Sequence, residues 1–127
     1  MLTKPPTVTH RWRHTARSIP LARAELRKAL ADWHLTAIED DSLVVLSELL
    51  TNAVVHARVP RDRRIETRFE HPVRDTVRIC VDDADPTHPH PGRGLSLVAA
   101  LSSSWGVSGR NGVGKRVWAV LRAERSE

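Results

Sequence analysis

A strongly apolar helical stretch that begins near residue 40 and ends at Pro60 constrains the fold of this chain more than any other feature. Its apolar residues recur every three or four positions, which predicts a helix with one buried face and a second layer that covers it. The residues of this apolar stripe are Leu43, Leu46, Leu50, Ala53 and Ala57. Two strongly polar residues, Glu48 and Asn52, interrupt the run. Because polar groups are costly among apolar neighbours, their presence indicates a function.

Glu48 and Asn52 are four positions apart, so they lie on the same face of the predicted helix. A carboxylate one turn before a carboxamide can place a proton acceptor beside an oxygen ligand for Mg²⁺. Hard cations of this kind prefer oxygen donors, and phosphate groups often complete their coordination. The helix is therefore predicted to form the floor of a nucleotide site, provided that a phosphate-binding loop lies close to it.

Length and composition predict one domain with a substantial core. The chain has 127 residues, of which 40% are hydrophobic, so we expect a single domain over residues 1–127 with residues 1–8 as a flexible lead-in. No apolar run approaches the roughly 20 residues that span a bilayer, and the first residues carry no signal-peptide pattern. Cys80 is the single cysteine, which excludes an internal disulfide or a cysteine zinc cluster. These features predict a cytoplasmic protein without a membrane segment.

The chain is basic, with a formal net charge of +5 and a sequence pI near 10.6. Arginines cluster locally at Arg58, Arg61, Arg63 and Arg64. Such a surface can attract nucleic acid, an acidic protein partner or polyphosphate, or it can simply be a solvated face. One Phe, four Trp and no Tyr offer little for stacking on bases, and no nucleic-acid reader motif is present. Nucleic acid is therefore the least favoured partner.

The remaining sequence predicts a two-layer α/β sandwich of the α+β kind. Strands are expected at residues 9–15, 64–70, 73–82, 105–107 and 115–122. Helices are expected at residues 19–33, from 40 or 41 to Pro60, and at 95–101. Because the strands come in adjacent pairs, we expect a mixed, mostly antiparallel sheet that about three helices cover on one face.

A long loop rich in Pro, Gly and Asp follows the third predicted strand, and long loops in small domains are often functional. Asp83 ends that strand and could accept a hydrogen bond from an exocyclic amine such as that of adenine. Gly92, Arg93, Gly94 and Leu95 open the next helix, where glycines and free backbone amides favour phosphate groups. Each feature also has an alternative interpretation without a ligand: Asp83 could simply form a turn, and Gly92 and Gly94 could simply begin a helix. The chain has neither a third glycine for a dinucleotide fingerprint nor a P-loop.

Together these residues resemble the GHKL (histidine-kinase-like) ATP-binding family, and within it the short bacterial anti-sigma-factor serine kinases and their actinobacterial relatives. The motif Glu-Leu-x-x-Asn-Ala-x-x-His-Ala is matched over residues 48–57. A strand that ends in Asp and is followed by Pro is matched over residues 81–86. Gly-Arg-Gly-Leu-x-Leu-Val and a later Trp-Gly-Val are matched at 92–98 and 105–107. The last strand is similar to Gly-Lys-Thr-Val-Trp at residues 114–118.

The resemblance covers about residues 18–122 and implies a Bergerat-type ATP-binding fold with ATP and Mg²⁺ as cofactors. It implies that Glu48 is the general base, that Asn52 ligates Mg²⁺ and that Asp83 reads the adenine amine. The residues implied to bind the nucleotide are Asn52, Ala53, His56, Asp83, Gly92, Arg93, Gly94 and Leu95. Residues 84–93 would form a lid over ATP. A role for His56 does not follow from its chemistry, and a purely structural histidine fits equally well.

Three departures from the family pattern concern the adenine end of the expected site. Asp85 stands where many members have a glycine, and Asp82 and Asp85 add carboxylates. Arg116 replaces a Thr whose hydroxyl often supports the adenine contacts. The long side chain of Arg116 could point away from the pocket or crowd it.

The resemblance implies an ATP-dependent Ser/Thr protein kinase that moves the γ-phosphate of ATP to a partner protein and/or sequesters a sigma factor. The implied partners are a sigma factor and a small phosphorylatable antagonist, and the implied assembly is a homodimer. The alternative is a non-catalytic module in transcriptional regulation, in which ATP shapes a protein-binding surface without being consumed. The departures at Asp85 and Arg116 motivate this alternative.

Overall fold

The computed structural model describes residues 4–55, 64–84, 95–110 and 114–124. Its elements follow in the order β1 (Thr7–Arg13), α1 (Ser18–Asp32), the short 3-10 helix η1 (Thr36–Ile38), α2 (Glu39–Val55), β2 (Arg64–Glu70), β3 (Thr76–Asp83), α3 (Leu95–Leu101), β4 (Ser104–Gly109) and β5 (Lys115–Arg122). Among these residues, no helix combines the length and the hydrophobicity needed to cross a bilayer.

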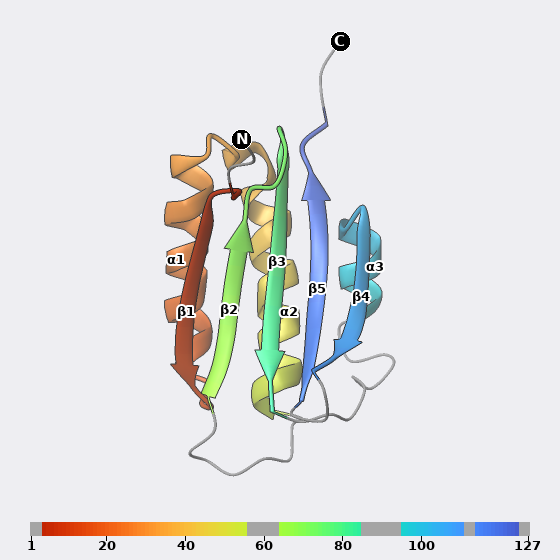
Figure 1. Cartoon of the computed structure of the whole chain (residues 1–127). Coiled ribbons are helices and arrows are strands. Elements are labelled where there is room, and N and C mark those ends of the chain that lie inside the picture. Colours follow the sequence, from red (N-terminus) through yellow and green to blue (C-terminus); the bar gives the residue numbers. More distant parts are fainter. Residues whose placement is uncertain (1–3, 56–63, 85–94, 111–113, 125–127) are drawn as a thin grey trace.

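The five strands form one sheet in the order β1-β2-β3-β5-β4, and the helices pack on one face of it (Figure 1). The predicted two-layer α+β fold class is confirmed. All four strand pairs are antiparallel, so the described part of the sheet is antiparallel throughout, whereas the sequence predicted a mixed, mostly antiparallel one. β5 lies between β3 and β4, because the chain crosses from β3 through α3 to the sheet edge before it turns back.

The core lies between α1, α2 and the sheet. Apolar residues alternate along the central strands, so one face of each strand packs against the helices. On β3 and β5 the helix-facing residues are Val77, Ile79, Val81, Val117, Ala119 and Leu121, all buried. The predicted apolar stripe of α2 faces them, with Leu46 and Leu50 fully buried. The stripe prediction is therefore confirmed as far as Ala53, and Ala57 and Pro60 lie outside the described residues.

Local chemistry sets the helix ends. α1 begins at Ser18, whose hydroxyl donates to the Arg13 carbonyl at 2.6 Å and so ties the helix to the end of β1. After α1 the chain turns through His34 in the left-handed region (φ 58°), where an αL residue commonly ends a helix. α2 carries three acidic residues in its first turn, which the helix dipole favours.

Three strand boundaries differ from the sequence prediction. β1 pairs with β2 from Thr7 to Arg13 rather than over 9–15, so the last two residues of the predicted lead-in belong to the sheet. β3 begins at Thr76, not at Val73. Val73 is 59% exposed and its carbonyl accepts from the Thr76 amide at 3.3 Å, within a turn that places Asp75 at a φ of 60°. β4 extends to residues 104–109 because it pairs along β5.

Leu46→Ala is expected to lower the free energy of unfolding by about 2–5 kcal/mol, because it leaves a cavity in the centre of the core. The matched control on the same helix is Val44→Ala, a residue that is 37% exposed, and it should change stability by less than about 0.5 kcal/mol. Urea denaturation followed by circular dichroism measures both. Equal losses would contradict this placement of the core.

Candidate functional site

The polar face of α2 carries the predicted Glu48 and Asn52 one turn apart. Asn52 is 9% exposed, and its side-chain nitrogen donates to the Glu48 carbonyl at 3.0 Å. This bond fixes the amide orientation, with the nitrogen on the helix backbone and the buried oxygen on the other side. Glu48 is half-buried, and Ala53 beside them packs in the core. The helix therefore holds a carboxylate and an oriented carboxamide near each other, as the spacing predicts.

Asp83 is the last residue of β3 and faces the helix layer, in register with the buried core residues of that strand. It is 1% exposed, and its carboxylate accepts from the Lys115 ammonium at 3.1 Å. Lys115, at the start of β5, is itself buried. The motifs in the sequence imply no role for Lys115. Its alternation with Val117 and the later apolar residues of β5 was the signal that it faces inward.

Two of the three predicted segments reach the same end of the molecule, and Leu95 is the described residue of the third. Figure 1 shows that β3 and α2 both end at the lower edge of the sheet, and that α3 lies higher, behind β4. α2 packs against both α3 and β3. Leu95 is the first residue of α3 and is half-buried.

Four predicted nucleotide-binding residues lie outside the described residues, namely His56, Gly92, Arg93 and Gly94. The same is true of Asp85 and of the predicted lid apart from Ala84. The structure therefore places Glu48, Asn52, Ala53, Asp83 and Leu95, and their roles as ligands stay predictions.

Gly114, the first residue of the motif at residues 114–118, lies against the end of β3. Its φ is 151°, and a Cβ built on it would lie 2.0 Å from the carbonyl oxygen of Asp83. Only glycine allows the two chain segments to approach this closely. Arg110 closes the same junction, because its amide donates to the Gly114 carbonyl and its guanidinium donates to the Asp83 carbonyl at 3.3 Å.

Arg116 points away from the helix layer, so it does not crowd the predicted site. Its guanidinium binds the Asp82 carboxylate with two hydrogen bonds, at 2.7 and 2.9 Å, on the opposite face of the sheet. The hydrogen bonds that Arg116 donates to the Asp82 carboxylate raise the pKa of its guanidinium, so Arg116 stays a cation. Two of the three departures, Asp82 and Arg116, therefore neutralise each other outside the site.

Cys80 has the packing role that its strand position predicts. It lies on the face opposite Val77, Ile79 and Val81, and it is 1% exposed. Burial raises the pKa of the Cys80 thiol, so the thiol stays protonated at neutral pH. A protonated, buried thiol is a poor nucleophile.

The donor chemistry of this end fits Mg²⁺ and a phosphorylated ligand. The buried carboxamide oxygen of Asn52 is a hard donor of the type that Mg²⁺ accepts, and Mg²⁺ is commonly held by few protein ligands plus phosphates. Among the described residues, no group of three His, Cys, Asp or Glu side chains forms a self-sufficient metal cage. A metal here would depend on Asn52 and on phosphate oxygens.

A family model described as the histidine kinase-like ATPase domain matches residues 4–121. The chain belongs to the histidine kinase-like ATPase family. The family resemblance drawn from the motifs is therefore confirmed. Domains of this family bind ATP with Mg²⁺, which agrees with the donor chemistry at the end of α2.

A solved structure shares this fold, the crystal structure of the RsbU and RsbW domains of Rv1364c from Mycobacterium tuberculosis. The two chains superpose with a TM-score of 0.73 at 22% sequence identity. The match covers 95% of this chain and 33% of that chain, so this chain spans about a third of the length of that protein. At this identity the likeness shows the fold alone. A comparison with curated protein sequences gave no match.

Lys115→Met is expected to lower the free energy of unfolding by about 3 kcal/mol, because it removes a buried ammonium from the buried Asp83 carboxylate. The double variant Lys115→Met/Asp83→Asn should recover part of this loss. The matched control is Lys28→Met, which removes a 72% exposed ammonium 3.5 Å from Glu25 and should cost less than about 1 kcal/mol. Urea denaturation measures all three, and equal costs for the two lysine changes would contradict the buried ion pair.

Proposed function

We propose that this chain is an ATP-binding regulatory protein that transfers the γ-phosphate of ATP to a Ser or Thr of a partner protein and/or sequesters a sigma factor. The observation that carries the proposal is the family match over residues 4–121, and it is supported by the ends of α2 and β3, which lie at one edge of the sheet. The motif residues Glu48, Asn52 and Asp83 lie on these two segments.

Phosphoryl transfer asks the protein mainly for positioning and charge stabilisation. Asn52 would present its carboxamide oxygen to Mg²⁺, which neutralises charge on the phosphates when it is bound. Glu48 would accept the proton of the attacking Ser or Thr hydroxyl, one helical turn from Asn52. The hydroxyl oxygen forms a bond to the γ-phosphorus, the bond to the β-phosphate oxygen breaks, and ADP leaves with that electron pair.

Asp83 would accept a hydrogen bond from the adenine amine while it shares its carboxylate with Lys115. The ammonium 3.1 Å away holds this acceptor in one orientation. A carboxylate that is held in this way needs little reordering when a base arrives. The proposed partners, a sigma factor and a small phosphorylatable antagonist, and the proposed homodimer follow from the likeness of the motifs to anti-sigma-factor kinases.

Asn52→Ala and Asp83→Asn are each expected to weaken ATP binding in the presence of Mg²⁺ at least about tenfold, because each removes a charged or metal-mediated contact. Isothermal titration measures the affinities with and without Mg²⁺. The Asn52→Ala effect should shrink without the metal, whereas the Asp83→Asn effect should persist. Glu39→Gln, at the other end of α2, is the control and should bind as the wild type does. Wild-type affinity in both site variants would overturn the nucleotide assignment.

Glu48→Gln is expected to reduce phosphate transfer about a hundredfold or more while ATP binding is preserved, because the hydroxyl loses its proton acceptor. The assay incubates the protein with γ-labelled ATP and a panel of small purified sigma-antagonist proteins and follows label on Ser or Thr. Undiminished transfer by Glu48→Gln would refute its role as base. ATP binding with no transfer to any protein of the panel would instead favour the ATP-gated binding module.

A further inference from the structure

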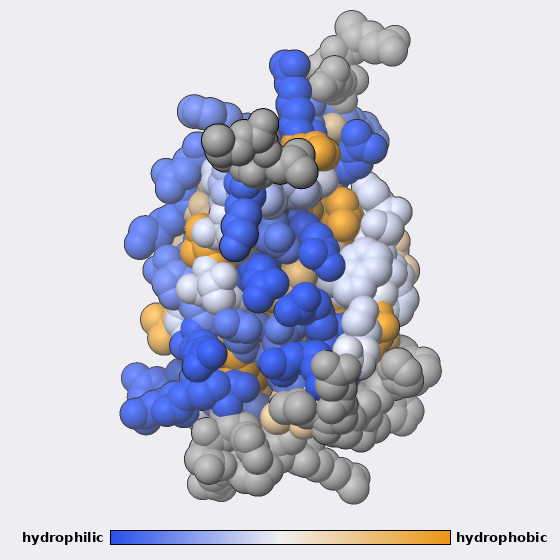
Figure 2. Space-filling model, in the orientation of Figure 1, coloured by the Kyte–Doolittle hydropathy of each residue, from blue (hydrophilic) through white to orange (hydrophobic). Residues whose placement is uncertain are grey.

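The face of the sheet away from the helices is turned toward the viewer in Figure 1, and its side chains are arranged in regular rows. The register of the strands arranges its side chains in rows that cross the sheet. One row consists of Arg11, Glu66, Asp82, Arg116 and Ser108. The two rows beside it hold Arg68, Cys80, Trp118 and Gly106, and then Glu70, Arg78, Val120 and Ser104. Figure 2 shows hydrophilic side chains over the centre of this face.

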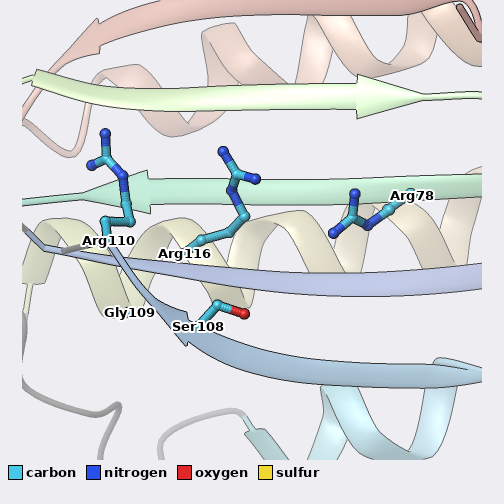
Figure 3. A pocket seen from close by; sticks show the side chains of 5 residues that line it. All are labelled: Arg78, Ser108, Gly109, Arg110 and Arg116. Carbon is cyan, nitrogen blue, oxygen red and sulfur yellow. The ribbon is translucent and has the colours of Figure 1, made fainter.

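A cleft of about 380 Å³ lies on this face where β3, β4 and β5 meet, lined by Arg78, Ser108, Gly109, Arg110 and Arg116. Figure 3 shows the side chains of Arg110, Arg116 and Arg78 following one another over β3, with Ser108 on β4, on the far side of β5. The side chains of Arg78, Arg110 and Arg116 are 34%, 37% and 29% exposed. Each guanidinium has five N–H donors, so donors remain available to a ligand in the cleft.

The guanidinium groups are held in place by neighbours. Asp82 accepts two hydrogen bonds from Arg116 and lies 3.8 Å from Arg110. Arg78 donates to Glu70 at 3.1 Å and lies 5.7 Å above the Trp118 ring. That ring rests on Gly106, where an added Cβ would meet it at 2.7 Å. Groups that are already ordered lose little entropy when a ligand binds.

The charge balance of the cleft favours an anion with separate charges. On these rows together with Arg110, the arginines outnumber the carboxylates by two: Arg11, Arg68, Arg78, Arg110 and Arg116 against Glu66, Glu70 and Asp82. A continuous chain of phosphates would meet these carboxylates and be repelled. Trp118 is half-buried, with Arg78 over its ring and Gly106 against it, so a base would have to displace Arg78 to stack there. A second copy of this face would bring like excess charge against it.

We propose that this cleft binds an acidic segment of a partner protein, with its Glu or Asp carboxylates on Arg78, Arg110 and Arg116. Planar guanidinium groups match carboxylates through paired hydrogen bonds. Arg78 lies four residues along β3 from Asp82, the register neighbour of Arg116, which is a distance of about 13 Å. An extended segment with acidic residues at every second position can reach both. The inference does not rest on ATP binding and is tested without nucleotide.

The probe is a fluorescein-labelled peptide of alternating Ser and Glu, about twelve residues long so that it can span the cleft in extended form. Fluorescence anisotropy at low salt measures its affinity, and a Ser–Gln peptide is the control ligand. The Glu peptide is expected to bind, and the Gln peptide is expected to bind at least about tenfold more weakly. Equal binding of the two peptides overturns the proposal.

Ser108→Glu tests the site without removing a contact of the fold. Ser108 is exposed and pairs with Arg116 across the strands, so a glutamate there would bind the arginines itself and displace the peptide. We expect at least about a tenfold loss of affinity, against no change for Ser108→Gln. Arg78→Gln should cost about threefold to tenfold. Arg27→Gln on the exposed side of α1 removes the same charge elsewhere and should change binding less than about twofold.

The outcomes separate the occupants of this face. Equal losses for Arg27→Gln and Arg78→Gln would show attraction by net charge alone and overturn the proposal. Tighter binding of a DNA duplex that Ser108→Glu abolishes would assign the face to nucleic acid instead. A dimer that sedimentation detects in the wild type and that Ser108→Glu dissociates would assign it to a second copy. Each of the last two results also overturns the proposal.

Discussion

The end of β3 holds two consecutive carboxylates, and the pleat of the strand forces them onto opposite faces of the sheet. Asp83 faces the helices and Asp82 faces away from them. β5 supplies a cation at the matching register position for each, Lys115 for Asp83 and Arg116 for Asp82. A slip of β5 by one residue would exchange the faces of both cations and turn its apolar side chains to solvent. This double pairing therefore supports the register on which both faces depend.

Along β3, the residues that stabilise the core and the residues of the proposed site occupy different ends of the strand. Its helix-facing residues are apolar up to Val81 and become acidic at Asp83. Burying the Asp83 carboxylate with Lys115 carries a desolvation cost that the ion pair only partly offsets. The apolar contacts of Leu46 and its neighbours in the core offset this cost, so the fold tolerates a buried ion pair at the end of β3. The proposed nucleotide site at that end therefore depends on the stability of the apolar core in the middle of the molecule.

The layers of the fold could be predicted from the sequence because their signals are local. The stripe of α2 and the alternation of β3 and β5 each occupy one short segment. Strand ends could not be predicted as well, because they depend on distant partners. β1 starts at Thr7 since β2 pairs with it that far, and apolar Val73 lies in a turn that the left-handed Asp75 closes. The strand propensity of a segment predicts neither the start of β1 nor the turn at Val73.

The residues of the candidate site likewise fall into those with a local signal in the sequence and those whose placement depends on another strand. Glu48, Asn52 and Asp83 stand out in the sequence because a polar residue in an apolar segment is itself a signal. Lys115 gives a weaker signal in the sequence, because a lysine in a strand is ordinarily solvated. Its burial is explained by the carboxylate of Asp83, which lies on a neighbouring strand. The orientation of Arg116 could not be predicted from its own segment, because the carboxylate of Asp82 on β3 determines it. In both cases the opposite charge on a neighbouring strand sets the orientation, because a buried charge without such a partner destabilises the fold.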